Sequence, residues 1–159
     1  MKIKIVAVGK IKEKFLRAGI DEFLKRLSRY AKVTIIEVAD EKLPANPGEA
    51  DLEAIKKREA ERIQKYLTGN SLVVALAIQG KQMSSTELSQ WIEGMMVQGK
   101  SEITFVIGGA VGLHKSILAS ADYLLSFSKL TFTHQMIRLI LLEQIYRVFR
   151  IIRGEPYHL

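Results

Sequence analysis

The segment Ser71-Leu72-Val73-Val74-Ala75-Leu76-Ala77-Ile78 decides the fold of this chain. Every residue after the serine is apolar, so both faces of an extended strand in this segment avoid water. A strand of this kind is typical of the centre of a parallel sheet that is covered on both sides. The turn-forming residues Gln79-Gly80-Lys81 come next, and we expect them to end the strand. The segment therefore predicts a parallel sheet with helices packed on both of its faces.

Strand and helix patterns alternate on either side of this segment. Apolar runs predict further strands at residues 2–8, 32–38, 102–107 and 123–127. Apolar residues at three- and four-residue spacing predict helices at residues 13–29, 51–67, 86–98, 114–119 and 133–152. We expect a single α/β domain over residues 1–159, with a mostly parallel sheet and helices on both faces. Ligands of such sheets bind beyond the carboxyl ends of the strands.

Positive charge is concentrated near the N-terminus. The 159 residues carry a formal net charge of +7. Residues 1–32 hold ten Lys or Arg against three Asp or Glu, whereas the remaining residues balance. Localised positive charge indicates attraction to phosphate or to an anionic membrane, and a merely solvated surface is the plainer alternative.

Composition excludes several classes of protein. The chain has no cysteine, which excludes disulfide frameworks, thiolate catalysis and cysteine-ligated zinc. Its longest apolar run, Leu72–Ile78, is far shorter than the ~20 residues of a membrane-spanning helix. The first ten residues alternate charged and apolar side chains where a signal peptide would be continuously apolar. We therefore expect a cytoplasmic protein that does not enter a membrane.

A glycine cluster follows the predicted strand at residues 102–107. Gly108, Gly109 and Gly112 lack side chains, so their backbone amides can approach a ligand closely. The cluster has neither the Lys-Ser/Thr pair of a P-loop nor the spacing of a dinucleotide-binding fingerprint. Two interpretations remain open, a tight turn without ligand and a loop that holds a nucleotide-like group.

The segment Ser126–His134 mixes hydroxyls, aromatic rings and one lysine just before the predicted last helix. One Ser or Thr would be enough to cap that helix. The additional hydroxyls and aromatics suit a loop that wraps a flat heterocycle with backbone hydrogen bonds and apolar flanks. Both interpretations carry comparable weight from the sequence.

The three histidines are scattered and have no accompanying carboxylates, so we expect no metal site. His134 and Arg138 are four residues apart and can project from one face of a helix. His158 belongs to a tail, Gly154–Leu159, that also contains a proline and a tyrosine. Frayed termini tend to be small and polar, so we expect this tail to dock against folded protein.

Several segments together carry a family resemblance. They are Ile107–His114, Ser126–Phe132, His134–Arg138, Glu143–Arg147 and Pro156–His158, with the opening Lys4–Lys10 and the segment Ile78–Lys81. In this order and spacing they resemble the RlmH family, the small 23S rRNA (pseudouridine-N3) methyltransferases that form a minimal branch of the SPOUT class. The resemblance spans the whole chain. It departs at Leu159, because many relatives place a basic residue after Tyr-His.

The resemblance implies an α/β fold with a C-terminal trefoil knot, a rare exception to unknotted topology. It also implies a homodimer, an assembled ribosome as substrate and S-adenosyl-L-methionine as the methyl donor. By family position, the cofactor would be bound by Leu76, Gly108, Phe127, Ser128, Lys129, Leu130, Thr131 and Phe132. Phe127 and Phe132 could equally be ordinary core residues.

Methylation of a ring nitrogen that carries a proton requires positioning and a proton acceptor. The candidate catalytic residues are His134, Tyr157 and His158. A neutral imidazole accepts a proton near neutral pH, whereas a tyrosine is better suited to orient the base as a hydrogen-bond donor. We expect the tail of one subunit to close over the cofactor of the other. A structural role for His134 is the alternative.

We expect basic side chains near both ends of the chain to contact the RNA backbone. The candidates are Lys10, Lys12, Lys14, Arg17, Arg138, Arg147 and Arg153. Two other functions remain possible from the sequence. A ribosome-binding module without catalysis would keep the charge and need no tail, and a nucleotide-dependent oxidoreductase would rest on the glycine cluster alone.

Overall fold

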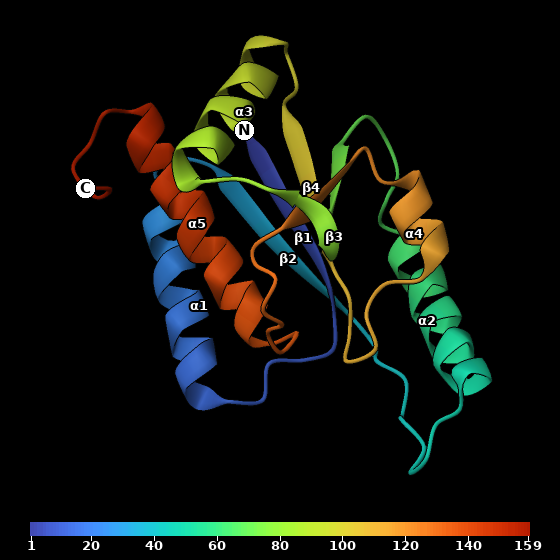
Figure 1. Ribbon diagram of the computed structural model, residues 1–159. Coiled ribbons are helices and arrows are strands. Elements are labelled where there is room, and N and C mark those ends of the chain that lie inside the picture. The colour runs from blue at the N-terminus through green and yellow to red at the C-terminus, as the bar shows by residue number, and fades with distance from the viewer.

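A computed structural model describes all residues, 1–159, as a parallel sheet flanked by helices (Figure 1). The five strands lie in the order β2-β1-β4-β3-β5. They are β1 (Lys2–Val8), β2 (Lys32–Val38), β3 (Leu72–Gln82), β4 (Glu102–Ile107) and β5 (Tyr123–Ser126). The helices are α1 (Lys14–Leu27), α2 (Glu49–Gln64), α3 (Ser85–Val97), α4 (Lys115–Ser120) and α5 (Met136–Ile152).

Every neighbouring pair of strands is parallel, so the prediction of a mostly parallel sheet is confirmed and the sheet is entirely parallel. β1 lies between β2 and β4, with Ile5 opposite both Ile35 and Phe105. The carboxyl ends of all five strands therefore lie along one edge of the sheet. This edge is where the segments after β3, β4 and β5 come together.

Helices cover both faces of the sheet, as predicted, but the two layers differ in size. One face packs against α1, α3 and α5 in a cluster of 22 buried apolar residues that includes Ile3, Ile5 and Phe105. The other face packs against α2 and α4 in a cluster of seven, which includes Val6 and Val8. Odd and even positions of β1 thus enter different cores, as the period of a strand requires. None of the helices combines the length and apolar character needed to cross a bilayer.

β3 departs from the prediction at its end. We expected Gln79-Gly80-Lys81 to close the strand, but β3 continues to Gln82. Leu76 and Lys81 both pair with Leu125 of β5, so the residues between them bulge out of the ladder. A Cβ on Gly80 would lie 2.7 Å from the backbone of Leu124, which explains the glycine. The bulge pushes the intervening residues beyond the sheet edge.

Candidate functional site

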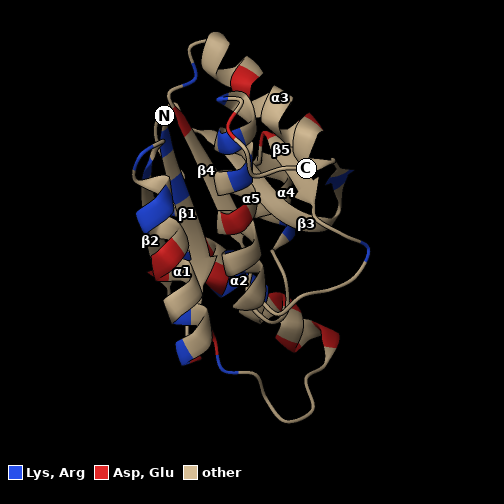
Figure 2. Ribbon diagram, turned by 90° about the vertical axis from the view of Figure 1, so that its left-hand side faces the viewer, with Lys and Arg blue, Asp and Glu red and all other residues tan.

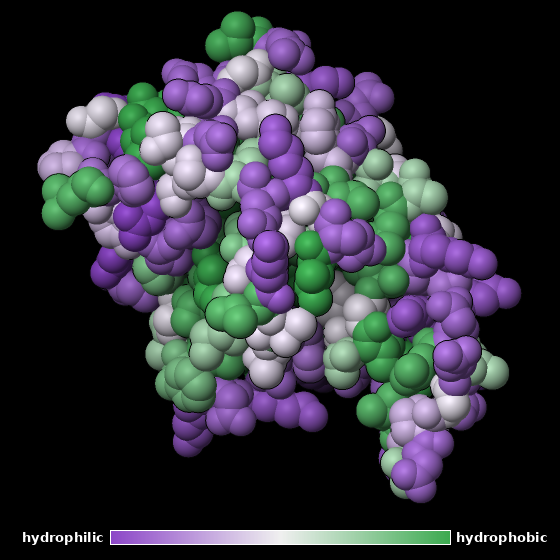
Figure 3. Space-filling view, viewed as in Figure 1, coloured by the Kyte–Doolittle hydropathy of each residue, from purple (hydrophilic) through white to green (hydrophobic).

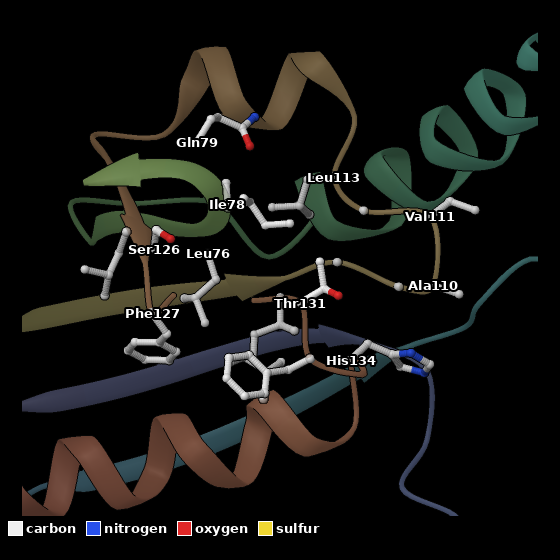
Figure 4. A pocket seen from close by; sticks show the side chains of 18 of the residues that line it. Leu76, Ile78, Gln79, Ala110, Val111, Leu113, Ser126, Phe127, Thr131 and His134 are labelled. Carbon is white, nitrogen blue, oxygen red and sulfur yellow. The ribbon is translucent and has the colours of Figure 1, made fainter. Parts of the chain in front are cut away.

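A cavity of about 470 Å³ lies beyond the carboxyl ends of β3, β4 and β5 (Figure 4). Three chain segments form most of its wall, namely the bulge of β3, the glycine loop after β4 and the loop after β5. The lining is mostly apolar, and a volume of this size suits a nucleoside-sized ligand. Seven of the eight residues expected to bind the cofactor line the cavity: Leu76, Gly108, Phe127, Ser128, Leu130, Thr131 and Phe132. Lys129 is not among the lining residues.

The mouth of the cavity carries apolar side chains that contact water. Ile78, Leu130 and Phe132 line the cavity and are also exposed. The apolar surface of this region is visible in the space-filling view (Figure 3). The sequence did not reveal that Ile78 is exposed at this mouth. The bulge that exposes Ile78 depends on the pairing of β3 with β5, which the local sequence does not show.

The glycine loop is both a tight turn and a wall of the cavity. Gly112 has a φ of +85° and donates its N–H to the carbonyl of Gly109 at 3.1 Å. A Cβ on Gly108 would lie 2.8 Å from the carbonyl carbon of Gly112. The loop therefore folds back on itself as a tight turn and lines the cavity with backbone, and its binding of a nucleotide-like group stays a prediction.

A buried acid lies behind the glycine loop and was missed by the sequence analysis. Glu59 of α2 is 3% exposed, and its Oε2 accepts the N–H of Glu41 at 3.1 Å while Oε1 has no partner. A Cβ on Gly109 would lie 3.1 Å from Oε1. Burial raises the pKa of Glu59, mainly by desolvation. The available signal was its spacing of four from Ile55 and Ile63, which places an acid on the apolar stripe of the helix.

The loop after β5 is held by its own hydroxyls. Ser126 Oγ donates to the carbonyl of Ser128 at 3.1 Å, and Ser128 Oγ accepts the N–H of Leu130 at 2.9 Å. Thr133 Oγ1 accepts the N–H of Met136 at 3.1 Å at the start of α5. One hydroxyl thus serves the helix start and two shape the loop, which is why the segment contains more hydroxyls than a helix cap requires.

His134 lies at the margin of the cavity (Figure 4). Its ring is half-buried against the end of β1, so that a Cβ on Gly9 would lie 3.3 Å from Nε2. Desolvation lowers the pKa of His134, and the nearby charge of Arg138 lowers it further. The imidazole is therefore held in its neutral form at physiological pH. A neutral ring at this position can accept a proton.

Arg138 is buried, and the expectation that it contacts RNA is wrong. Its side chain is 1% exposed. The guanidinium pairs with Glu37 at 2.6 Å and donates to the carbonyl of Gly9 at 3.0 Å. Glu37 also accepts the N–H of Ile11 at 3.2 Å. The arginine thus joins the ends of β1 and β2 to the first turn of α5, where a phosphate has no access.

Four of the expected RNA-binding residues lie on the loop before α1 and on its first turn. Lys10, Lys12, Lys14 and Arg17 are all exposed. The backbone N–H of Lys12 donates to Gln135 Oε1 at 3.0 Å, which brings this loop beside the residue that follows His134. The Lys and Arg positions of β1 and α1 are marked in Figure 2. The basic loop therefore borders the same end of the molecule as the cavity.

The C-terminal tail docks, as expected, but against α5 of its own chain and not at the cavity. Tyr157 OH donates to Glu143 at 3.1 Å, and its ring packs edge-on against Tyr146 at 4.9 Å between centroids. His158 Nδ1 lies 3.2 Å from Arg147 Nη1. Figure 1 shows the C-terminus beyond α5, on the side away from α4. The structure does not bring Tyr157 or His158 to the cavity of the same chain.

The two remaining basic candidates have partners within the chain. Arg147 is half-buried and donates to Glu143 at 2.7 Å. Arg153 is exposed, and its guanidinium lies over the ring of Tyr30 at 4.8 Å. No group of three or more His, Asp or Glu side chains is arranged to hold a metal ion.

Comparison with known proteins identifies close relatives of the whole chain. The family model described as "Predicted SPOUT methyltransferase" matches residues 1–158. A protein of Halothermothrix orenii named "Ribosomal RNA large subunit methyltransferase H" is 56% identical over 158 residues, covering 99% of each chain. A protein of Acetivibrio thermocellus with the same name is 55% identical over the same length and coverage.

A solved structure supports the fold alone. It is described as a probable methylase family protein from Haemophilus influenzae, with 15% identity to this chain and a TM-score of 0.52. The match covers 99% of this chain and 70% of the other. At this identity the likeness concerns the arrangement of strands and helices.

Proposed function

The chain belongs to the SPOUT methyltransferase family, and from this premise we propose that it methylates N3 of a pseudouridine in the 23S rRNA of assembled ribosomes. SPOUT methyltransferases use S-adenosyl-L-methionine, and membership of the family implies a C-terminal trefoil knot. Its relatives are named for the RNA of the large ribosomal subunit. A ribosomal substrate implies an enzyme of the cytoplasm.

The observation that carries the proposal is the cavity beyond β3, β4 and β5, because its residues fit the cofactor. The glycine loop offers close backbone approach, and Leu76 and Phe127 offer apolar cover for a flat ring. We assign cofactor binding to Leu76, Gly108 and the loop Phe127–Phe132, with Lys129 as the residue whose side chain contributes least. When bound there, S-adenosyl-L-methionine supplies a methyl group from its sulfonium.

The chain itself has two tasks in the transfer, namely to align the target nitrogen and to let its proton leave. His134 is suited to the second task, because it is neutral and lies at the margin of the cavity. We infer that it accepts the N3 proton directly or through a water molecule.

We infer that the active enzyme is a homodimer. Tyr157 and His158 are the other candidate catalytic residues, and neither reaches the cavity of its own chain. A tail that takes part in the reaction must then serve the cavity of a second copy. The exposed apolar side chains at the mouth, Ile78, Leu130 and Phe132, favour such a partner, since burial in an interface would remove them from water.

We infer that residues 1–159 act as one domain. The exposed cations Lys10, Lys12, Lys14 and Arg17 would then hold the rRNA backbone beside the cavity. Arg153 is exposed and remains a candidate, whereas Arg147 is engaged with Glu143. With so small a surface, the shape of the assembled ribosome would have to supply specificity.

Two measurements test the proposal. Titration calorimetry should show binding of S-adenosyl-L-methionine to the folded protein. Methyl transfer should be observed on ribosomes that carry the pseudouridine, and much less on protein-free 23S rRNA. Absence of cofactor binding by folded protein, or equal transfer to ribosomes that lack the pseudouridine, would refute the proposed reaction.

A further inference from the structure

The C-terminal tail is held by a network of charged hydrogen bonds centred on Glu143. Its Oε1 accepts from Arg147 Nη2 at 2.7 Å, from Arg147 Nε at 3.1 Å and from Tyr157 OH at 3.1 Å. Its Oε2 accepts from Gln144 Nε2 at 2.7 Å. Gln144 in turn accepts from Ser85 Oγ at 2.7 Å, which connects the network to the first turn of α3. The position of the tail is therefore defined by side chains of two helices.

The contact between Arg147 and His158 fixes which nitrogen of the imidazole carries the proton. Arg147 Nη1 lies 3.2 Å from His158 Nδ1. A guanidinium has only N–H donors and keeps its charge in proteins. His158 Nδ1 must therefore be the acceptor of this bond, and the hydrogen of the neutral ring lies on Nε2.

We propose that Arg147 and Glu143 are positioning residues that turn His158 into a hydrogen-bond donor through Nε2, so that the tail stabilises charge on the target base instead of taking its proton. This inference rests on the proposed methyl transfer. His158 is exposed, so its Nε2–H is free to meet a group outside its own chain. Arg147 takes a role different from the RNA contact expected from the sequence.

Tyr157, like His158, is not arranged to act as a base. Its O–H is donated to Glu143, and burial, followed by this hydrogen bond, raises the pKa of Tyr157. The phenol therefore stays protonated at physiological pH. Since neither tail residue has a free basic atom in this arrangement, the N3 proton must leave by another route, to His134 or to water.

A donor at this place has a defined use in the reaction. A bond forms between N3 of the base and the methyl carbon while the carbon–sulfur bond breaks, its electron pair remains on sulfur, and the N3 proton passes to His134 or water. As the proton leaves, negative charge spreads from N3 to the neighbouring carbonyl oxygens. An N–H directed at one of these oxygens stabilises that charge, and loss of one such donor costs about 100-fold or more in rate.

Two substitutions at His158 separate a donor from a base. The glutamine amide of His158→Gln can place an N–H near the position of Nε2 but cannot accept a proton, whereas His158→Ala removes both functions. In single-turnover transfer to ribosomes, we expect His158→Gln to stay within about tenfold of the wild type and His158→Ala to fall by about 100-fold. Equal losses in the two variants would overturn the proposal.

The pH dependence of the rate provides a second readout. If His158 were the base, its replacement in His158→Gln would remove one ionisation from the pH profile of the rate. We expect the wild type and His158→Gln to share one pH profile, since on the proposed route the N3 proton passes to His134 or water in both. Profiles that differ by one ionisation would overturn the proposal.

Arg147→Lys tests the positioning role. A lysine keeps the charge but lacks the planar fork of donors that holds Glu143 and His158 in a fixed relative geometry. We expect about a tenfold loss of rate at saturating ribosome with unchanged affinity for S-adenosyl-L-methionine. A wild-type rate in Arg147→Lys would refute the positioning role. Failure of the wild-type protein to methylate ribosomes would refute the proposed function itself, which is a different outcome from any of these.

Discussion

The cavity and the C-terminal tail are held by different kinds of interaction. Turns of backbone and apolar side chains at the ends of strands form the cavity, whereas an ion-pair network on the surface of α5 holds the tail. A cavity of this kind depends on how closely backbone segments approach. A tail of this kind depends on single polar atoms. We therefore expect changes near the start of α5, beside the cavity, to alter stability and cofactor affinity. Changes near the end of α5, where the tail is held, should alter the rate of methyl transfer.

The largest effect is expected at the buried pair beside the cavity. Glu37→Gln leaves the guanidinium of Arg138 without its anion at 1% exposure, and the free energy of unfolding should fall by about 3 kcal/mol. Denaturant titration measures this. As a control, Glu22→Gln removes the exposed partner of Arg26 and should cause no measurable change. Similar losses in the two variants would contradict the contrast between buried and surface pairs.

The second largest effect is expected where the backbone of the glycine loop packs closely, at Gly108. The methyl of Gly108→Ala would meet the carbonyl carbon of Gly112 at 2.8 Å and force the loop to move. We expect affinity for S-adenosyl-L-methionine to fall by about 100-fold, measured by calorimetry. Gly94→Ala in α3 is the matched control, because nothing lies within 4 Å of its Cβ position. Unchanged affinity in Gly108→Ala would show that the loop is not part of the cofactor site.

Removal of the tail should lower the rate of methyl transfer without changing the affinity for the cofactor. A chain that ends at Glu155 loses Tyr157 and His158 but none of the residues that line the cavity. We expect methyl transfer to fall by about 100-fold, while calorimetry with S-adenosyl-L-methionine gives the wild-type affinity. Transfer at the full rate would show that the tail has no part in the reaction.

A smaller effect is expected from the basic loop. Lys12→Glu, Lys14→Glu and Arg17→Glu together reverse exposed charges beside the cavity without touching its lining. Ribosome binding should weaken by about tenfold or more, and its dependence on salt concentration should become less steep. Affinity for S-adenosyl-L-methionine should not change. A loss of cofactor binding would contradict the separation of the two surfaces.

The smallest effect is expected at Glu59. Because burial raises its pKa, the folded protein binds this proton more tightly than the unfolded chain does. The free energy of unfolding should therefore fall as the pH rises from the ordinary range of a carboxyl to the raised value. Glu59→Gln should remove this dependence and stabilise the protein by about 1 kcal/mol at neutral pH, in denaturation across a pH series. Glu61→Gln, exposed on the same helix, should keep it.

The sequence predicted what depends on local patterns. The strands and helices were identified from their periodicity, and the segments that line the cavity from family resemblance and from strand ends. Arg138 was misassigned because its partner Glu37 lies 101 residues away, and no local pattern reveals such a pair. The continuation of β3 to Gln82 was missed for the same reason, since it requires β5 as a neighbour.

For the C-terminal tail, the sequence predicted that it docks but not where it docks. Its aromatic, imidazole and proline correctly predicted docking, because such residues are unusual in a frayed terminus. The docking surface could not be predicted, since it consists of Glu143 and Arg147 on a helix face where a salt bridge at four-residue spacing looks like ordinary surface. Only the positions of Tyr157 and His158 in space show that Glu143 and Arg147 also contact the tail.

The order of the strands also has a consequence for protein synthesis. β5 is the last strand to leave the ribosome exit tunnel and lies at the edge of the sheet, yet its pairing with β3 creates the bulge that walls the cavity. All parallel pairings join distant parts of the chain and form slowly. A nascent chain that has not yet delivered Tyr123–Ser126 therefore lacks this cavity, so that a ligand of the cavity can stabilise the chain only after β5 has paired.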